Sequence, residues 1–165
     1  MNPFKIEKLS REHGVDGFDC GSQLLNNFLR RFALANQQAN GSQTYVGSGH
    51  GAVIGFYTLV VSEVEIQLAP PRMVKGLAPF PVPVMLLARL AVDLSWQGKG
   101  VGAGLMRDAM RRTLQAADIA GIRALVVHAK DDVAHQFYSH FGFADGFTDP
   151  LHLYVLTKEL KLLAG

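Results

Sequence analysis

The chain has 165 residues, 48% hydrophobic and 18% charged, which is typical of one soluble globular domain with a sizeable core. Its formal net charge of +2 is too small to indicate a nucleic-acid partner, and its single cysteine, Cys20, excludes an internal disulfide. The first residues lack the apolar segment of a signal peptide, and no apolar run is long enough to span a bilayer. We therefore expect a cytoplasmic protein with no membrane association.

The first part of the chain predicts a strand, a loop and a helix. Residues Phe4–Leu9 alternate between apolar and charged side chains, which is typical of a half-buried strand. A loop rich in glycine and aspartate follows over residues 11–21, and Ser22 is placed to cap a helix that runs to about Gln37. The apolar face expected for this helix comprises Leu24, Leu25, Phe28, Leu29, Phe32 and Leu34.

A hairpin and a proline-rich segment are predicted next. Thr44–Val46 begins the hairpin, Gly47–Gly51 forms its turn, and Ala52–Ile66 continues as one long strand bent near Ser62. The segment Leu68–Pro83 holds five of the seven prolines, so it is neither a long helix nor a central strand. We expect an extended surface loop there, with a substrate-facing loop as the alternative.

The second half alternates strands and helices. Val84–Val92 is almost continuously apolar and predicts a central strand buried on both faces. A long amphipathic helix, Val101–Ala120, leads to a second buried strand, Ile122–His128. Asp131 or Asp132 is placed to cap a short helix, Val133–His140.

A last strand, Leu151–Leu156, and a frayed tail, residues 158–165, complete the prediction. We find no repeats, no low-complexity tract and no linker to a second domain. The pattern therefore predicts a single α/β domain, residues 1–165, with a mixed central sheet.

The glycine-dense loop Gln97–Gly102 lies between the central strand and the long helix, where backbone N–H groups bind anions. It does not match a Walker A loop, because Asp93 stands in place of the first glycine and Gly100 in place of the Ser or Thr. A dinucleotide-binding pattern fits poorly, since five residues separate the strand from Gly98 and the next strand ends in His128 rather than an acid.

The remaining pattern, [Gln/Arg]-x-x-Gly-x-[Gly/Ala], resembles the pyrophosphate loop of the GNAT acyl-CoA-dependent N-acetyltransferases. Four motifs in order are similar to the GNAT toxins of type II toxin–antitoxin modules: Phe18–Gly21, Gly55–Leu59, Leu87–Asp93 and Phe137–Tyr138. This resemblance covers nearly the whole chain. It implies a GNAT fold splayed at the acyl-CoA site, acetylation of the α-amine of aminoacyl-tRNA, a small ribbon-helix-helix antitoxin as partner, and a homodimer.

The chain departs from these toxins at two positions. His128 stands where they usually carry an acidic residue, and Asp131 where an asparagine often follows. Both positions lie near the acyl-CoA channel that the resemblance implies, so they bear on substrate detail rather than on the fold.

The resemblance assigns roles to particular residues. Tyr138 would protonate the leaving thiolate of CoA, for which an ordinary phenol pKa near 10 is suitable; a core aromatic is the alternative. N–H groups of the loop would bind pyrophosphate, and those near Leu90 would hold pantetheine and polarise the thioester. The expected acetyl-CoA-binding residues are Leu90, Ala91, Val92, Gln97, Gly98, Lys99, Gly100, Val101, Gly102, Asp131 and Phe137. We expect no metal.

The acceptor amine must attack unprotonated. An α-amine has a pKa of about 7.7–8.0, whereas a lysine amine near 10.4 requires a base. The central strand offers no evident carboxylate except Asp93, which modestly favours an α-amine. His128 is a possible base, although a structural histidine is the more common role for such a residue.

A tRNA acceptor requires cations that face phosphates. The expected cations on the substrate side are Arg30, Arg31, Arg72, Lys75 and Arg89. Arg89 stands out because an arginine within an apolar strand needs a partner or a cleft. Two other functions remain open: a GNAT enzyme for a small-molecule or peptide amine, and a non-catalytic acyl-CoA-binding interaction module.

Overall fold

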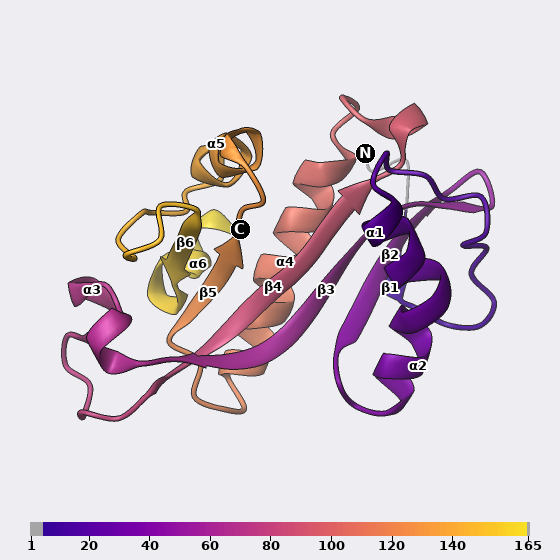
Figure 1. Ribbon diagram of the computed structural model, residues 1–165. Helices are drawn as coiled ribbons and strands as arrows, with labels where there is room; N and C mark the ends of the chain where they lie inside the picture. The colour runs from indigo at the N-terminus through magenta and orange to yellow at the C-terminus, as the bar shows by residue number, and fades with distance from the viewer. Residues whose placement is uncertain (1–4, 165) are drawn as a thin grey trace. The chain divides into compact units, whose positions relative to one another are not determined.

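The computed structural model describes residues 5–164, which form two compact units (Figure 1). Unit one comprises residues 5–60 and 88–109, and unit two comprises residues 61–87 and 110–164. The chain passes between the units within three elements: β3 (Ala52–Val64), β4 (Val82–Val92) and α4 (Val101–Ala117). The six strands are ordered β1-β2-β3-β4-β5-β6 in one mixed sheet, as expected for the predicted α/β class.

The strands of unit one form an antiparallel meander. β1 (Lys5–Lys8) pairs with β2 (Gln43–Gly49), and β2 pairs with β3. The hairpin turn is shorter than predicted, because Gly47–Gly49 belong to β2 and the reversal occurs at His50 and Gly51, where φ is +53° and +79°. The predicted first strand is confirmed over Lys5–Lys8, while Phe4 lies outside the described residues.

The predicted helix after Ser22 is three contiguous segments: α1 (Gln23–Asn27), the π-helical η1 (Phe28–Phe32) and α2 (Ala33–Gln38). The Ser22 cap is confirmed, since its hydroxyl accepts the N–H of Leu25 at 3.3 Å. Figure 1 shows these helices beside β1 and β2, and a core cluster joins Phe28 to Phe56 of β3. The predicted apolar face is wrong at Leu24 and Phe32, whose exposed fractions are 82% and 59%.

The first half of α4 packs against β3 in unit one. A Cβ at Gly55 would lie 2.9 Å from Leu105 and 3.1 Å from Val101, so only glycine allows this close approach. A short 3₁₀ turn, η3 (Leu94–Trp96), separates β4 from the glycine loop.

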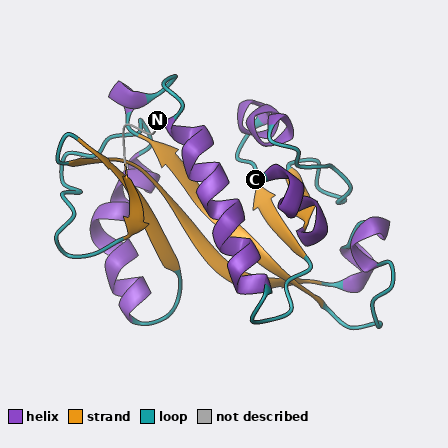
Figure 2. Cartoon of the chain, turned by 180° about the vertical axis from the view of Figure 1, so that it is seen from behind, coloured by secondary structure: helices purple, strands orange, loops and turns teal. Residues whose placement is uncertain are grey.

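Unit two contains β5 (Ala124–His128), β6 (His152–Leu156), the short helices η2 (Ile66–Leu68) and α3 (Pro71–Val74), and the helices α5 (Asp132–His140) and α6 (Thr157–Leu163) (Figure 2). β4 runs parallel to β5 through Met85–Leu87, and β5 pairs antiparallel with β6. Its core cluster comprises Met73, Val82, Val84, Ala124, Val126, Tyr154 and Leu156.

Three predictions are wrong in unit two. The tail is helical rather than frayed, and Leu160 of α6 is fully buried. The segment Leu68–Pro83 contains α3, which the Arg123 guanidinium anchors by donating to the carbonyls of Met73 and Lys75, each at 2.9 Å. β4 begins at Val82 and so includes Pro83, which was predicted to lie outside the central strand. Pro83 has no N–H to donate, but its carbonyl accepts the N–H of Arg123 at 2.8 Å.

The central strand is also less buried than predicted. Val84, Met85 and Leu87 are buried, but Ala88 is exposed and Arg89 and Leu90 are half-buried. The end of β4 is therefore partly open to solvent, unlike a strand that is covered on both faces. Within residues 5–164, no helix is long and apolar enough to cross a membrane.

Candidate functional site

The predicted site residues divide between the two units. Unit one holds Leu90, Ala91, Val92, Gln97, Gly98, Lys99, Gly100, Val101, Gly102, Arg30, Arg31 and Arg89. Unit two holds Asp131, Phe137, Tyr138, Arg72 and Lys75. Each set has its own local geometry.

The glycine loop has the form of an anion-binding site. Gly98 and Gly100 have φ of +77° and +85°, and a Cβ at either position would meet no atom within 4 Å. Helix α4 begins at Val101, and the Gly104 N–H donates to the Gly100 carbonyl. The N–H groups of the first helical residues, up to Ala103, come before this bond and point out of the helix N-terminus. The glycines thus permit both the turn and the close approach of a phosphate to the helix N-terminus.

A set of side-chain hydrogen bonds ties this loop to β4. The Gln97 amide donates to the Val92 carbonyl at 2.9 Å, so the first residue of the motif braces the strand end. The Asp93 carboxylate accepts the Ser95 N–H at 3.0 Å, the Ser95 hydroxyl at 2.6 Å and the Asp19 N–H at 3.1 Å. Partial burial works against ionisation, but these hydrogen bonds hold the pKa of Asp93 below its ordinary value.

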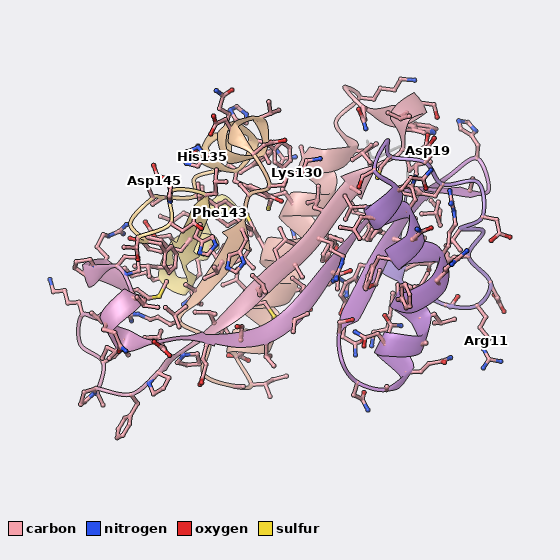
Figure 3. The ribbon with its side chains drawn as sticks, viewed as in Figure 1. Arg11, Asp19, Lys130, His135, Phe143 and Asp145 are labelled. Atoms are coloured by element: carbon pink, nitrogen blue, oxygen red, sulfur yellow. The ribbon has the colours of Figure 1, made fainter. Side chains whose placement is uncertain are left out.

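The segment Asp19–Gly21 supports the loop from the other side, a role that the sequence did not predict. The Leu94 N–H donates to the Asp19 carbonyl at 2.8 Å, and the Asp19 carboxylate accepts the Gly21 N–H and the Asn26 amide, each at 2.9 Å. Asp19 is labelled in Figure 3. The four-residue motif around Asp19 was the available signal, but its partner Asp93 lies 74 residues away.

The backbone at the end of β4 presents donors away from β3. The Asp93 N–H donates to the Ile54 carbonyl of β3 at 2.8 Å. Because successive residues of a strand direct their N–H groups to opposite sides, those of Val92 and Leu90 face away from β3. Ala91 lies on the β3 side, so of the three predicted residues it is the least suited to donate to a ligand.

Arg89 has no acidic partner in the described part of the chain. Its guanidinium carbon lies 3.7 Å from the centroid of the Phe28 ring, which is a close cation–π contact. Burial lowers the pKa of Arg89. Arg30, by contrast, donates to the Phe18 carbonyl, whereas Arg31 is exposed.

Tyr138 lies on α5 in an aromatic setting. Its ring contacts Phe137 and Phe143 edge-on, with centroids 5.4 and 5.6 Å apart. Burial raises the pKa of Tyr138 to about 12, above the ordinary value expected from the sequence. Within residues 5–164 its hydroxyl makes no hydrogen bond.

Two other predicted residues of unit two, Asp131 and Arg72, have structural partners. Asp131 caps α5 as predicted, with its carboxylate accepting the Ala134 N–H at 2.9 Å. Arg72 forms an ion pair with Glu159 at 3.0 Å, and this hydrogen bond raises the pKa of Arg72. Lys75 is exposed.

Two histidine contacts were not predicted. The His128 ring stacks on His152 of β6, with centroids 3.8 Å apart. Burial is the main cause that lowers the pKa of His128, and the charge of His152 lowers it further. His135 of α5 approaches Asp145 at 2.6 Å, and Figure 3 shows the two labelled residues near each other. Within residues 5–164, no group of three His, Cys, Asp or Glu side chains is placed to hold a metal ion.

Comparison with known proteins gives consistent matches. A family model described as "Acetyltransferase (GNAT) domain" matches residues 40–145. A tRNA-acetylating toxin of Mycobacterium tuberculosis is 46% identical over 158 residues, which are 96% of this chain and 95% of that protein. A probable toxin TacT of Sinorhizobium fredii is 24% identical over 97% of this chain and 94% of its own length.

Solved structures also match over nearly the whole chain. A tyrosine-to-phenylalanine mutant of KacT has a TM-score of 0.90 at 29% identity, covering 98% of this chain and 99% of that one. AtaT complexed with acetyl-methionyl-tRNAfMet has a TM-score of 0.89 at 31% identity, with 98% and 99% coverage. AtaTR bound with acetyl-CoA has a TM-score of 0.85 at 32% identity and covers both chains completely.

Proposed function

The chain belongs to the GNAT acetyltransferase family, and we propose that it transfers the acetyl group of acetyl-CoA to the α-amine of aminoacyl-tRNA and so blocks translation. The observation that carries this proposal is the similarity, over nearly the whole chain, to the tRNA-acetylating toxin of Mycobacterium tuberculosis. The likeness to AtaT in complex with an acetylated aminoacyl-tRNA supports the substrate class. The family model crosses both units, which supports one catalytic domain.

The glycine loop is the proposed site for the pyrophosphate of acetyl-CoA. The N–H groups at the start of α4 and the open space beside Gly98 and Gly100 fit a phosphate, and Lys99 adds a nearby positive charge. Gln97 keeps the loop joined to the end of β4 through the Val92 carbonyl. Acetyl-CoA supplies an activated acetyl thioester, and the loop fixes its distant end.

The backbone of β4 is the proposed donor to the reacting end. The N–H groups of Leu90 and Val92 face away from β3, so they are suited to hold pantetheine and to polarise the thioester carbonyl. A fixed backbone donor stabilises the negative charge that develops on that oxygen without reorganisation.

Tyr138 is the proposed proton donor to the sulfur of CoA. Because burial raises its pKa to about 12, the phenol keeps its proton throughout the physiological pH range. The same burial makes it a weaker acid than an ordinary tyrosine. It therefore acts by hydrogen bonding to the sulfur as negative charge develops, with the proton transferred as the carbon–sulfur bond breaks.

The acceptor amine needs little help from the protein. An α-amine with a pKa of about 7.7–8.0 is partly neutral at cytoplasmic pH. This suits a chain whose candidate base, His128, has no acidic partner of its own among the described residues. The proposed RNA contacts are Arg31 and Arg89 in unit one and Lys75 in unit two, with Arg30 and Arg72 contributing charge from their bonded positions.

The biological setting follows from the same proposal. The solved complex of AtaT with the antitoxin AtaR supports an antitoxin as partner, and we propose a ribbon-helix-helix protein because the resemblance to the GNAT toxins implies one. We further propose a cytoplasmic homodimer, because both proposed substrates are cytoplasmic and the resemblance to the GNAT toxins implies a homodimer.

Induced expression tests the toxin function. We expect the wild-type chain to arrest growth, and Tyr138→Phe to relieve the arrest because it removes the proton donor while keeping the ring. In vitro, loss of a general acid lowers kcat by about 10²-fold or more. Normal growth on wild-type expression, without an antitoxin present, would contradict the proposal. Circular dichroism of Tyr138→Phe checks that the variant is folded.

A further inference from the structure

We propose that an exposed face of α1 and η1, together with Arg89, binds the single-stranded 3′ end of the RNA substrate by base stacking and phosphate contact. This surface, the α1–η1 face, comprises the exposed Leu24, Arg31 and Phe32 together with the half-buried Arg89, whose guanidinium lies on the buried Phe28 ring. The proposal rests on the proposed function and extends it to a specific binding surface that no comparison assigns.

The first observation is the exposure of apolar side chains on these helices. Leu24 is 82% exposed and Phe32 is 59% exposed, although both follow the helical spacing of core residues. Leu24, Phe28 and Phe32 are spaced four residues apart. In an α-helix, a residue four positions on lies beyond one full turn, so Leu24 and Phe32 would flank Phe28 on opposite sides.

The π-helical turn η1 changes that arrangement. Because a π turn closes i to i+5 bonds and takes more residues per turn, Phe32 falls short of a full turn from Phe28. Phe32 is therefore on the same flank of Phe28 as Leu24, and the two exposed side chains line one side of the helix. The π turn therefore places Leu24 and Phe32 on the same side of the helix, whereas a regular α-helix would place them on opposite sides of Phe28.

The second observation is the state of Arg89. Its guanidinium covers the Phe28 ring at 3.7 Å, and it makes no hydrogen bond or ion pair with an acid in residues 5–164. Half-buried cations normally have a partner, because desolvation is costly. A flat guanidinium held on an aromatic ring leaves its N–H donors free for a phosphate.

The third observation is charge. The helical stretch from Gln23 to Gln38 contains two arginines and no acidic residue. Arg30 is directed to the Phe18 carbonyl, which leaves Arg31, next to Phe32, at the surface. Exposed aromatic and apolar side chains between unpaired cations are the features with which proteins bind single-stranded nucleic acid.

The position of Arg89 connects this face to the reacting end of the substrate. Arg89 is three residues before Val92 on β4, about 10 Å along a strand, which is the scale of a terminal nucleotide. An RNA end on the α1–η1 face therefore lies within reach of the backbone donors of β4.

The test compares Phe32→Ala with wild type, using Ile119→Ala as a control, since Ile119 is an exposed apolar residue outside this face. Two readouts are measured: fluorescence anisotropy with a labelled single-stranded RNA hexamer ending in CCA, and steady-state acetylation of bulk aminoacylated tRNA. We expect Phe32→Ala to weaken hexamer binding and to raise KM for aminoacyl-tRNA by about tenfold, since stacking on an aromatic ring is worth about that factor per base. Its kcat and its KM for acetyl-CoA stay unchanged.

Arg89→Gln provides a second, independent variant. We expect it to weaken hexamer binding and to lower the slope of log affinity against log salt concentration by about 1, because one phosphate contact is lost. Arg89→Lys keeps that slope but loses the flat contact with Phe28. Sedimentation of wild type and Phe32→Ala completes the set.

Three results would overturn the proposal: hexamer affinity and KM unchanged in Phe32→Ala, a salt slope unchanged in Arg89→Gln, or a wild-type dimer that Phe32→Ala converts to a monomer. The last would make this face a subunit interface. If wild type transfers no acetyl group to any aminoacyl-tRNA, the proposed function fails, and the hexamer measurement still decides whether the face binds RNA.

Discussion

His128 is an imidazole whose protonated form the fold disfavours. It stacks on His152 at 3.8 Å, and burial and the charge of His152 lower its pKa, while Asp149 works in the opposite direction. The Asp149 carboxylate lies 3.5 Å from the His152 ring, so this carboxylate pairs with His152 rather than with His128.

The lowered pKa of His128 predicts how stability depends on pH. Below the ordinary histidine pKa of about 6.5, the unfolded chain binds a proton that the folded chain resists. The free energy of unfolding therefore falls as pH decreases from about 7 through that value, until it reaches the lower pKa of the folded state. We expect thermal unfolding to show this fall, and His128→Gln to reduce it.

His140→Gln serves as the control, because His140 lies on α5 outside the stacked pair. An equally steep fall of the melting temperature in His128→Gln and in wild type would contradict the assignment to this residue.

Individual residues show where sequence patterns were sufficient. Tyr138 was predicted as the proton donor from its motif, but its raised pKa depends on burial among Phe137 and Phe143, which the motif does not specify. Leu24 and Phe32 were predicted to be core residues because their spacing matches an α-helix. The π turn between them alters that period, and no residue type in Phe28–Phe32 signals a π turn.

At the level of elements, Asp93 joins three of them: the end of β4, the turn η3 and the segment before α1. Its carboxylate caps η3 through the Ser95 N–H and accepts the Asp19 N–H. These bonds position Gln97 and the glycine loop relative to Val92. The loop proposed to bind acetyl-CoA is therefore held by contacts of residues that precede it in the chain.

Asp93→Ala tests this support. We expect KM for acetyl-CoA to rise several-fold with a smaller change in kcat, because the loop loses its position while Tyr138 is untouched. Loss of a capping carboxylate costs about 1 kcal/mol of stability. Steady-state kinetics and urea unfolding measure both effects, and Asp16→Ala, in the exposed preceding loop, is the control. An unchanged KM for acetyl-CoA would show that the loop positions itself.

Elements whose stability comes from distant contacts were the ones missed. The tail folds as α6 because Leu160 is buried and the Ala164 carbonyl accepts from Arg111 at 3.2 Å. Helix α3 depends on Arg123, which lies about fifty residues further along the chain. Local pattern identified the β-hairpin, α4 and α5, where caps, turns and apolar period are all within one segment.

At the scale of the whole molecule, the predicted α/β class and mixed sheet are confirmed, along with the GNAT fold. Alternating strands and helices were enough for that conclusion. The predicted cations, however, belong to two units, with Arg31 and Arg89 in one and Arg72 and Lys75 in the other. Sequence order alone does not show this division, since β3, β4 and α4 each contribute to both units.

The central claim is that the α-amine of aminoacyl-tRNA accepts the acetyl group. The most direct measurement is mass spectrometry of the amino acids released by mild base from aminoacylated tRNA after incubation with the protein and acetyl-CoA. We expect N-acetylated amino acids, none from tRNA whose α-amine is already blocked, and far less with Tyr138→Phe. Unmodified amino acids from wild-type reactions, alongside acetylation of free small amines or peptides, would contradict the claim and assign this enzyme a different substrate.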